Sequence, residues 1–145
     1  MNERFNEGQI GEIAARITTT LPAATDSAVV VALSGELGAG KTTLTQAIAR
    51  ELGVSVAVQS PTFVISKYYD TTDERFDHLV HIDAYRIEKE SELIPLRWES
   101  LLKQPRTVVI VEWPERIAAA LPQDTYWYRL SHEGSERTIS YDADH

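Results

Sequence analysis

The stretch GELGAGKT, residues 35–42, carries residue types that suit the binding of nucleotide phosphates. Gly35, Gly40, Lys41 and Thr42 fit the pattern G-x-x-x-x-G-K-[ST], known as the P-loop. Glycines let the backbone approach closely, and N–H groups at the start of a helix neutralise phosphate charge. The Lys41 ammonium adds a full charge near the β- and γ-phosphates, and the Thr42 hydroxyl can coordinate Mg²⁺. The pattern predicts a site for a nucleotide and Mg²⁺; the alternative is a glycine-rich turn that holds no ligand.

The predicted nucleotide contacts within this motif are Gly38, Ala39, Gly40, Lys41, Thr42 and Thr43. Glu112 follows the apolar run TVVIV, where P-loop proteins place an acidic residue that holds Mg²⁺. The alternative is an ordinary carboxylate at a strand end. Trp113, the next residue, can stack on a base or fill the core. We therefore take Thr42 and Glu112 as the candidate metal ligands.

The segment HIDAYR places His81, Asp83 and Tyr85 on one side of an expected extended segment. Asp83 can orient water, bind Mg²⁺ through water or act as a base, and we assign it to the catalytic group with Lys41. The alternative is a hydrogen-bonded strand end. The turn SPTF, residues 60–63, contains Thr62 and lies where P-loop switches place a γ-phosphate sensor. A simple strand-entry turn is the other interpretation.

Apolar periodicity predicts the elements that position these residues. The unbroken apolar runs at 28–33 and 108–111 indicate strands buried on both faces, as in parallel sheets. Residues 63–69 and 78–83 form an expected antiparallel pair, and residues 126–131 and 136–141 form a terminal hairpin. Expected helices cover residues 7–17, 41–52, 94–103 with Pro95 at the first helical position, and 114–122. The prediction is a single α/β domain over residues 1–145, with a central, mostly parallel sheet, an antiparallel hairpin and flanking helices.

Composition excludes several classes of function. The chain has 145 residues, 43% apolar residues and no cysteine, so it has neither disulfides nor thiolate metal sites. Its net charge is −8, which disfavours a direct grip on nucleic acid. No apolar run approaches the length of a membrane span, and the first residues lack the apolar core of a signal peptide. We expect a cytoplasmic protein, monomeric, that contacts RNA only through a partner.

Four separated motifs, GELGAGKTTL, SPTFVI, HIDAYR and VEWPERI, occur in this order along the chain. This combination closely resembles the bacterial TsaE (YjeE-type) family of P-loop ATPases. The resemblance implies a small protein that binds ATP and Mg²⁺ and is needed to make threonylcarbamoyladenosine next to the anticodon of tRNA. It also implies two protein partners, TsaD and TsaB, whose complex this protein resets without itself transferring the threonylcarbamoyl group.

The resemblance assigns roles to individual residues. Lys41 and Thr42 match the phosphate and Mg²⁺ positions, and Glu112 matches the acidic metal residue. Asp83 matches the catalytic or switch acid, and Trp113 matches the aromatic residue beside the metal. Further matches are Thr62 in the switch-like turn and Arg137 as a C-terminal basic residue near the nucleotide.

The chain departs from the family pattern at three places. Glu36 replaces the usual Asp after the first P-loop glycine, and a residue near Glu7 replaces an N-terminal Thr close to the base. The segment SELIPLRWESLL differs from the usual acidic stretch that ends in Leu-Gly. These changes concern the base contact and a surface that meets a partner.

Two other functions remain open at the level of the sequence. A small kinase for a nucleotide or sugar would use Asp83 as the base for an acceptor hydroxyl. A non-catalytic, nucleotide-dependent binding module would use the P-loop without turnover. A screen for phosphate acceptors separates the kinase from the ATPase.

Overall fold

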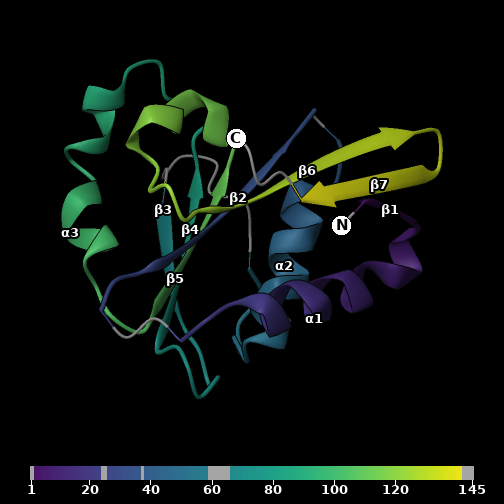
Figure 1. Ribbon diagram of the computed structural model, residues 1–145, viewed down its shortest axis with the longest axis horizontal. Helices are drawn as coiled ribbons and strands as arrows, with labels where there is room; N and C mark the ends of the chain where they lie inside the picture. The colour runs from purple at the N-terminus through teal and green to yellow at the C-terminus, as the bar shows by residue number, and fades with distance from the viewer. Residues whose placement is uncertain (1, 24–25, 37, 59–65, 142–145) are drawn as a thin grey trace.

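A computed structural model describes residues 2–23, 26–36, 38–58 and 66–141. Their strands form one mixed seven-stranded sheet in the order β1-β7-β6-β2-β5-β4-β3 (Figure 1). The strands are β1 (Asn2–Phe5), β2 (Val29–Gly35), β3 (Ser66–Asp70), β4 (His78–Asp83), β5 (Thr107–Glu112), β6 (Tyr126–Glu133) and β7 (Glu136–Tyr141). The α-helices are α1 (Ile10–Thr20), α2 (Lys41–Glu51) and α3 (Trp98–Leu102). Three 3-10 helices complete the described elements: η1 (Glu7–Gln9), η2 (Glu90–Leu93) and η3 (Pro114–Ala120).

The centre of the sheet is parallel and its edges are antiparallel. The four central strands, β6, β2, β5 and β4, run parallel to one another. At the edges, β3 pairs with β4 and β7 pairs with β6 in the antiparallel sense. Both predicted hairpins are therefore confirmed, apart from residues 63–65, which lie outside the described residues. The added strand β1 pairs with β7 and was not predicted, because four mostly polar residues carry no alternating pattern.

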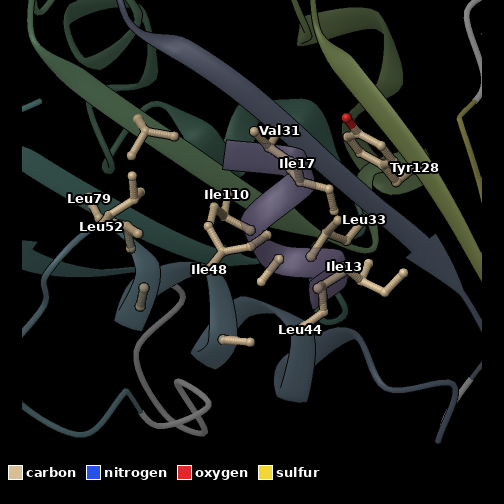
Figure 2. Packing of buried hydrophobic residues seen from close by; sticks show 14 of the residues in the cluster. Ile13, Ile17, Val31, Leu33, Leu44, Ile48, Leu52, Leu79, Ile110 and Tyr128 are labelled. Atoms are coloured by element: carbon tan, nitrogen blue, oxygen red, sulfur yellow. The ribbon is translucent and has the colours of Figure 1, made fainter. Parts of the chain in front are cut away.

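The central strands are buried on both faces, as their apolar runs predict. In β2, Val29, Val31 and Leu33 pack against α1 and α2, while Val30 faces the opposite layer. Figure 2 shows the first layer, where Ile13 and Ile17 of α1 and Leu44, Ile48 and Leu52 of α2 meet the sheet. On the other face, Trp98 and Leu101 of α3 and Ile117 of η3 cover β4 and β5. The sheet is thus held rigidly between two layers, with the carboxyl ends of its parallel strands on one edge.

The predicted helix over residues 94–103 is wrong in its start. Pro95 is not at the first helical position, because α3 begins only at Trp98. Arg97 before it has a left-handed backbone with φ 54°, which ends the preceding series of turns. The Leu96 N–H donates to Leu93 and the Arg97 N–H donates to Ile94, so these residues form turns after η2 rather than a helix. The helix predicted at 114–122 is a kinked 3-10 helix, η3, which ends at Ala120 and has a non-helical backbone at Ile117.

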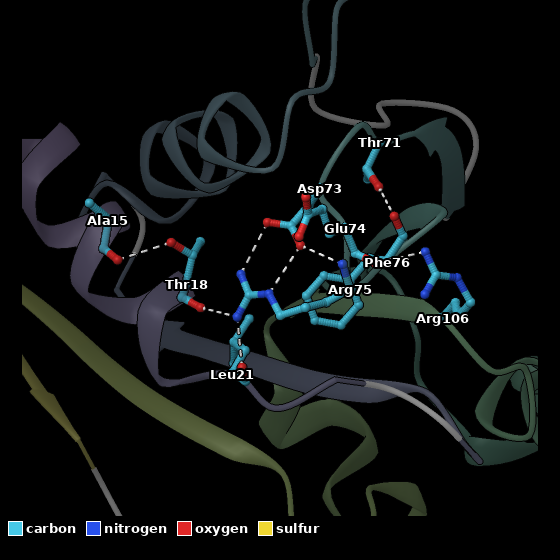
Figure 3. Close-up of polar contacts among 9 residues, drawn as sticks. All are labelled: Ala15, Thr18, Leu21, Thr71, Asp73, Glu74, Arg75, Phe76 and Arg106. Carbon is cyan, nitrogen blue, oxygen red and sulfur yellow. Dashed lines mark hydrogen bonds and ion pairs between the residues drawn. The ribbon is translucent and has the colours of Figure 1, made fainter.

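The polar loop between β3 and β4 has a structural role, because Arg75 in it contacts the end of α1. Arg75 donates two hydrogen bonds of 2.7 Å to the carbonyls of Thr18 and Leu21, at the end of α1 (Figure 3). The same guanidinium contacts both carboxylate oxygens of Asp73, at 3.0 and 3.1 Å. Arg75 therefore links the end of α1 to the loop between β3 and β4, in addition to the apolar packing of α1 on the sheet.

Candidate functional site

The P-loop connects the carboxyl end of β2 to the start of α2, as the motif requires. Gly35 lies against the backbone of Leu130 on β6, so closely that a Cβ atom at this position would collide with the Leu130 carbonyl. Gly40 has φ 101° as the residue that caps α2, and a Cβ atom there would lie 2.9 Å from the Arg137 guanidinium. Both positions therefore need glycine. The first N–H groups of α2 have no partner within the helix and point to the side of the loop, which makes this end of the helix suited to anions.

Lys41 is almost completely buried and is held at the P-loop by three groups. Its ammonium donates to the carbonyls of Gly35 at 2.5 Å and Glu36 at 2.9 Å. The same nitrogen lies 4.2 Å from the centre of the Trp113 ring, a cation–π contact. Burial lowers the pKa of Lys41 from its ordinary value, and the charges of Glu112, Glu115 and Asp83 partly oppose that change.

Glu112 is buried at the end of β5 and contacts two other polar side chains. The Thr42 hydroxyl donates to Glu112 Oε1 at 2.9 Å. Glu112 Oε2 lies 2.5 Å from His81 Nε2, and His81 is fully buried on β4. The structure thus brings together the two residues that the sequence predicts as metal ligands, and it adds His81, which was not assigned to the site.

Asp83 ends β4 directly beside Glu112, because the two residues are partners in the parallel register of β4 and β5. Burial raises the pKa of Asp83 above its ordinary value, and the charge of Glu112 raises the pKa further. The hydrogen bond from the Tyr85 N–H lowers the pKa and so opposes both effects. Tyr85 does not continue the strand but follows it in a turn, where its ring lies 5.0 Å from that of Trp113. The expectation of three side chains on one strand face holds for His81 and Asp83 only.

The remaining predicted site residues differ in where the structure places them relative to the P-loop. The Arg137 guanidinium donates to the Gly38 carbonyl at 3.1 Å and to Glu7 Oε1 at 3.2 Å, so it packs on the P-loop. Thr43 is exposed on the first turn of α2, whereas the side chain of Ala39 is buried in the core. Thr62 lies outside the described residues. Trp113 is partly buried and packs against the second layer of the core.

A pocket of about 650 Å³ opens beside the P-loop, on the side of β6. Its walls include Glu36, Trp113, Trp127, Arg129 and His132. This volume falls within the range of small-molecule sites. The P-loop therefore has room beside it for part of a ligand or for a side chain of a partner.

The donor set at the P-loop fits Mg²⁺ bound together with a nucleotide. Mg²⁺ is commonly held by one or two oxygen ligands from the protein together with substrate phosphates. Thr42 and Glu112 supply a hydroxyl and a carboxylate side by side. Among the described residues, no group of three or more His, Asp or Glu side chains is arranged to hold a metal alone. Thr42 and Glu112 are therefore the described residues that could hold Mg²⁺ beside the phosphates of a nucleotide.

A family model described as threonylcarbamoyl adenosine biosynthesis protein TsaE matches residues 6–139. The chain belongs to the TsaE family. The tRNA threonylcarbamoyladenosine biosynthesis protein TsaE of Bacillus subtilis is 39% identical over 79% of this chain and 69% of that protein. The TsaE protein of Streptomyces coelicolor is 42% identical over 70% of this chain and 67% of that protein. The chain spans about two thirds of the length of these two TsaE proteins.

A solved structure supports the fold assignment. The crystal structure of Bacillus subtilis YdiB superimposes with a TM-score of 0.71 and 28% sequence identity, over 97% of this chain and 83% of that one. The predicted P-loop α/β fold is therefore confirmed. None of the described helices is long and apolar enough to cross a membrane.

Proposed function

We propose that this chain is a Mg²⁺-dependent ATPase that acts in the threonylcarbamoyladenosine modification of tRNA. The observation that carries the proposal is the bond between Thr42 and Glu112 beside the buried Lys41. The hydroxyl hydrogen of Thr42 is directed to Glu112, so the lone pairs of its oxygen are available to a cation. Membership of the TsaE family supports the tRNA-modification pathway.

Each residue of the site has a distinct task in this proposal. Lys41 would exchange its bonds to the Gly35 and Glu36 carbonyls for the phosphates of ATP. Thr42 and Glu112 would hold Mg²⁺, and the chemistry that Mg²⁺ supplies when bound is neutralisation of phosphate charge. Asp83, the neighbour of Glu112 in the register, would orient the attacking water.

Partners enter the proposal because Arg137, the described arginine that packs on the P-loop, is bonded to the Gly38 carbonyl and to Glu7 and so is not directed to a transition state. P-loop enzymes without a transition-state arginine are slow, and an arginine supplied by a partner raises the rate by about 10³–10⁵-fold. Arg86, the internal candidate, is exposed in the turn after β4. We therefore propose that a TsaB–TsaD pair completes the site in the cytoplasm, and that tRNA is contacted through that complex.

The test is an ATP-hydrolysis assay with and without the cognate TsaB–TsaD pair. We expect slow hydrolysis by the isolated protein and clearly faster hydrolysis in the presence of the pair. The Asp83→Ala variant should lose the stimulated rate while it keeps its affinity for ATP, because a water-orienting group acts mainly in the transition state. Full-speed hydrolysis by the isolated protein would contradict the dependence on a partner.

A second candidate function is a small P-loop kinase, which the pocket beside the P-loop favours. A kinase needs a site for the acceptor, and the pocket of about 650 Å³ adjoins Gly35 at the start of the P-loop. A screen of nucleosides and sugars with labelled ATP separates the two functions. Transfer of the label to a defined acceptor supports the kinase, and release as inorganic phosphate alone supports the ATPase.

A further inference from the structure

His81 is the one member of the polar cluster around Glu112 that has no task in the reaction above. It is fully buried on β4, and its Nε2 atom lies 2.5 Å from Glu112 Oε2. A carboxylate that binds Mg²⁺ is ionised and can only accept hydrogen bonds, so in the proposed complex Nε2 carries the hydrogen and donates it. The two oxygens of Glu112 are thereby fixed separately, Oε1 by Thr42 and Oε2 by His81.

Among the residues that the structure describes, the His81 ring makes one hydrogen bond, to Glu112. Its Nδ1 atom is buried, with no hydrogen-bond partner among the described residues. The adjacent residues Val80 and Ile82 face the opposite layer of the core. The register partners of His81 are Ile110 in β5 and Lys67 in β3. A buried polar ring costs free energy relative to an apolar side chain unless its bonds offset that cost. The bond to Glu112 is therefore the evident purpose of an imidazole here.

The carboxylate that His81 holds has a competing attraction nearby. The Lys41 ammonium attracts the Glu112 carboxylate, and the charge of Asp83, next to Glu112 in the register, repels it. A carboxylate free to rotate would turn toward the ammonium and release the Thr42 hydroxyl. The hydrogen bond from His81 opposes that rotation, because it attaches Glu112 Oε2 to a ring that the core holds in place.

We propose that His81 is a positioning residue that orients Glu112, so that the Thr42 oxygen presents its lone pairs to Mg²⁺. This inference rests on the proposed Mg²⁺–ATP function. Outer partners of metal ligands act in this way, and their loss typically costs 10–100-fold in metal affinity or activity. His81 thus acts through Glu112 and touches neither nucleotide nor metal.

The experiment measures binding of a fluorescent, non-hydrolysable ATP analogue across a range of Mg²⁺ concentrations. His81→Phe removes the donor and keeps a buried ring, and His81→Gln keeps an N–H donor near the position of Nε2. We expect His81→Phe to raise the half-saturating Mg²⁺ concentration about 10–100-fold, with unchanged affinity for the metal-free analogue. His81→Gln should lie between this variant and the wild type. His78→Gln, at an exposed position of the same strand, is the matched control and should change neither quantity.

The outcomes separate this inference from the proposed function. If Mg²⁺ strengthens binding in the wild type but His81→Phe behaves identically, the positioning role is wrong. If Mg²⁺ has no effect on the wild type, the proposed function itself fails.

A second measurement uses the wild-type protein and does not depend on the folding of a variant. NMR of ¹⁵N-labelled histidine should show an exchange-protected, strongly deshielded Nε2 proton for His81. That signal should shift when Mg²⁺ and the analogue bind together. Absence of the protected proton would overturn the inference.

Discussion

At the scale of single residues, Lys41 carries the largest expected contribution to nucleotide binding. Lys41→Ala should weaken ATP binding about 10–100-fold, since a charge-assisted contact is worth about 1.5–3 kcal/mol. Isothermal titration calorimetry measures the loss. Lys103→Ala, at an exposed lysine that follows α3, is the matched control and should bind like the wild type. Unchanged affinity in Lys41→Ala would contradict a phosphate role for this ammonium.

The charged form of Asp83 has a role in the proposed reaction, but its burial lowers the stability of the folded protein. Burial raises its pKa, so the folded state holds the proton more tightly than the unfolded chain does. The resulting loss of stability is absent below the pKa of the unfolded chain and complete above the raised pKa of the folded state. Asp83→Asn should therefore raise the melting temperature of the nucleotide-free protein at neutral pH, because Asn still accepts the Tyr85 N–H without carrying a charge.

Melting curves of Asp83→Asn and the wild type from pH 3 to pH 7 test the sign of this effect. The difference in melting temperature should close toward acid pH. Asp77→Asn is the opposite case, because a hydrogen bond from Arg106 lowers the pKa of Asp77. That control should not be stabilised at neutral pH. A lower melting temperature for Asp83→Asn at neutral pH would show that its charge is stabilised in the folded state.

At the scale of elements, Arg75 adds two hydrogen bonds to the packing that holds the end of α1. Arg75→Ala leaves the carbonyls of Thr18 and Leu21 without this donor, so we expect a loss of about 2–3 kcal/mol in the free energy of unfolding. Arg75→Lys should fall between, because an ammonium cannot reproduce the planar fork on Asp73 and both carbonyls. Urea denaturation followed by circular dichroism measures each change.

Arg106 provides the comparison for Arg75 in the same region (Figure 3). It pairs with Asp77 at 3.0 Å, but its side chain is 45% exposed, and such surface pairs contribute about 1 kcal/mol or less. Arg106→Ala should therefore destabilise the protein less than Arg75→Ala does. Equal effects of the two substitutions would mean that the bonds to α1 add nothing beyond a surface ion pair.

At the scale of the whole molecule, net charge limits what the isolated protein can bind. The chain has 22 acidic and 14 basic residues, for a net charge of −8. Repulsion from phosphates should make tRNA binding by the protein alone weak. Fluorescence anisotropy with labelled tRNA measures this at several salt concentrations, with the TsaB–TsaD pair as the positive arm. Tight, salt-sensitive binding by the isolated protein would reveal a local basic surface that outweighs the net charge.

The amino-acid sequence by itself determined the P-loop and the strand that ends at Glu112. Both depend on local patterns: glycine spacing before a helix, and an unbroken apolar run before a carboxylate. The P-loop and this carboxylate also predict Thr42 and Glu112 as metal ligands, but that β2 lies beside β5 comes from the tertiary structure. The start of α3 could not be predicted, since the left-handed backbone of Arg97 leaves no trace in the apolar pattern.

Only the tertiary structure decided which distant side chains join the site. His81 reaches Glu112 because β4 lies beside β5, and Arg137 reaches Gly38, 99 positions away in the sequence, because the terminal hairpin lies beside β2. Lys41 lies over Trp113 because β2, which precedes the P-loop, lies beside β5, which precedes Trp113. Strand order and register set these contacts, and both follow from how whole faces pack into the core. A local pattern fixes what a side chain can do, whereas its partners depend on packing between segments far apart in the chain.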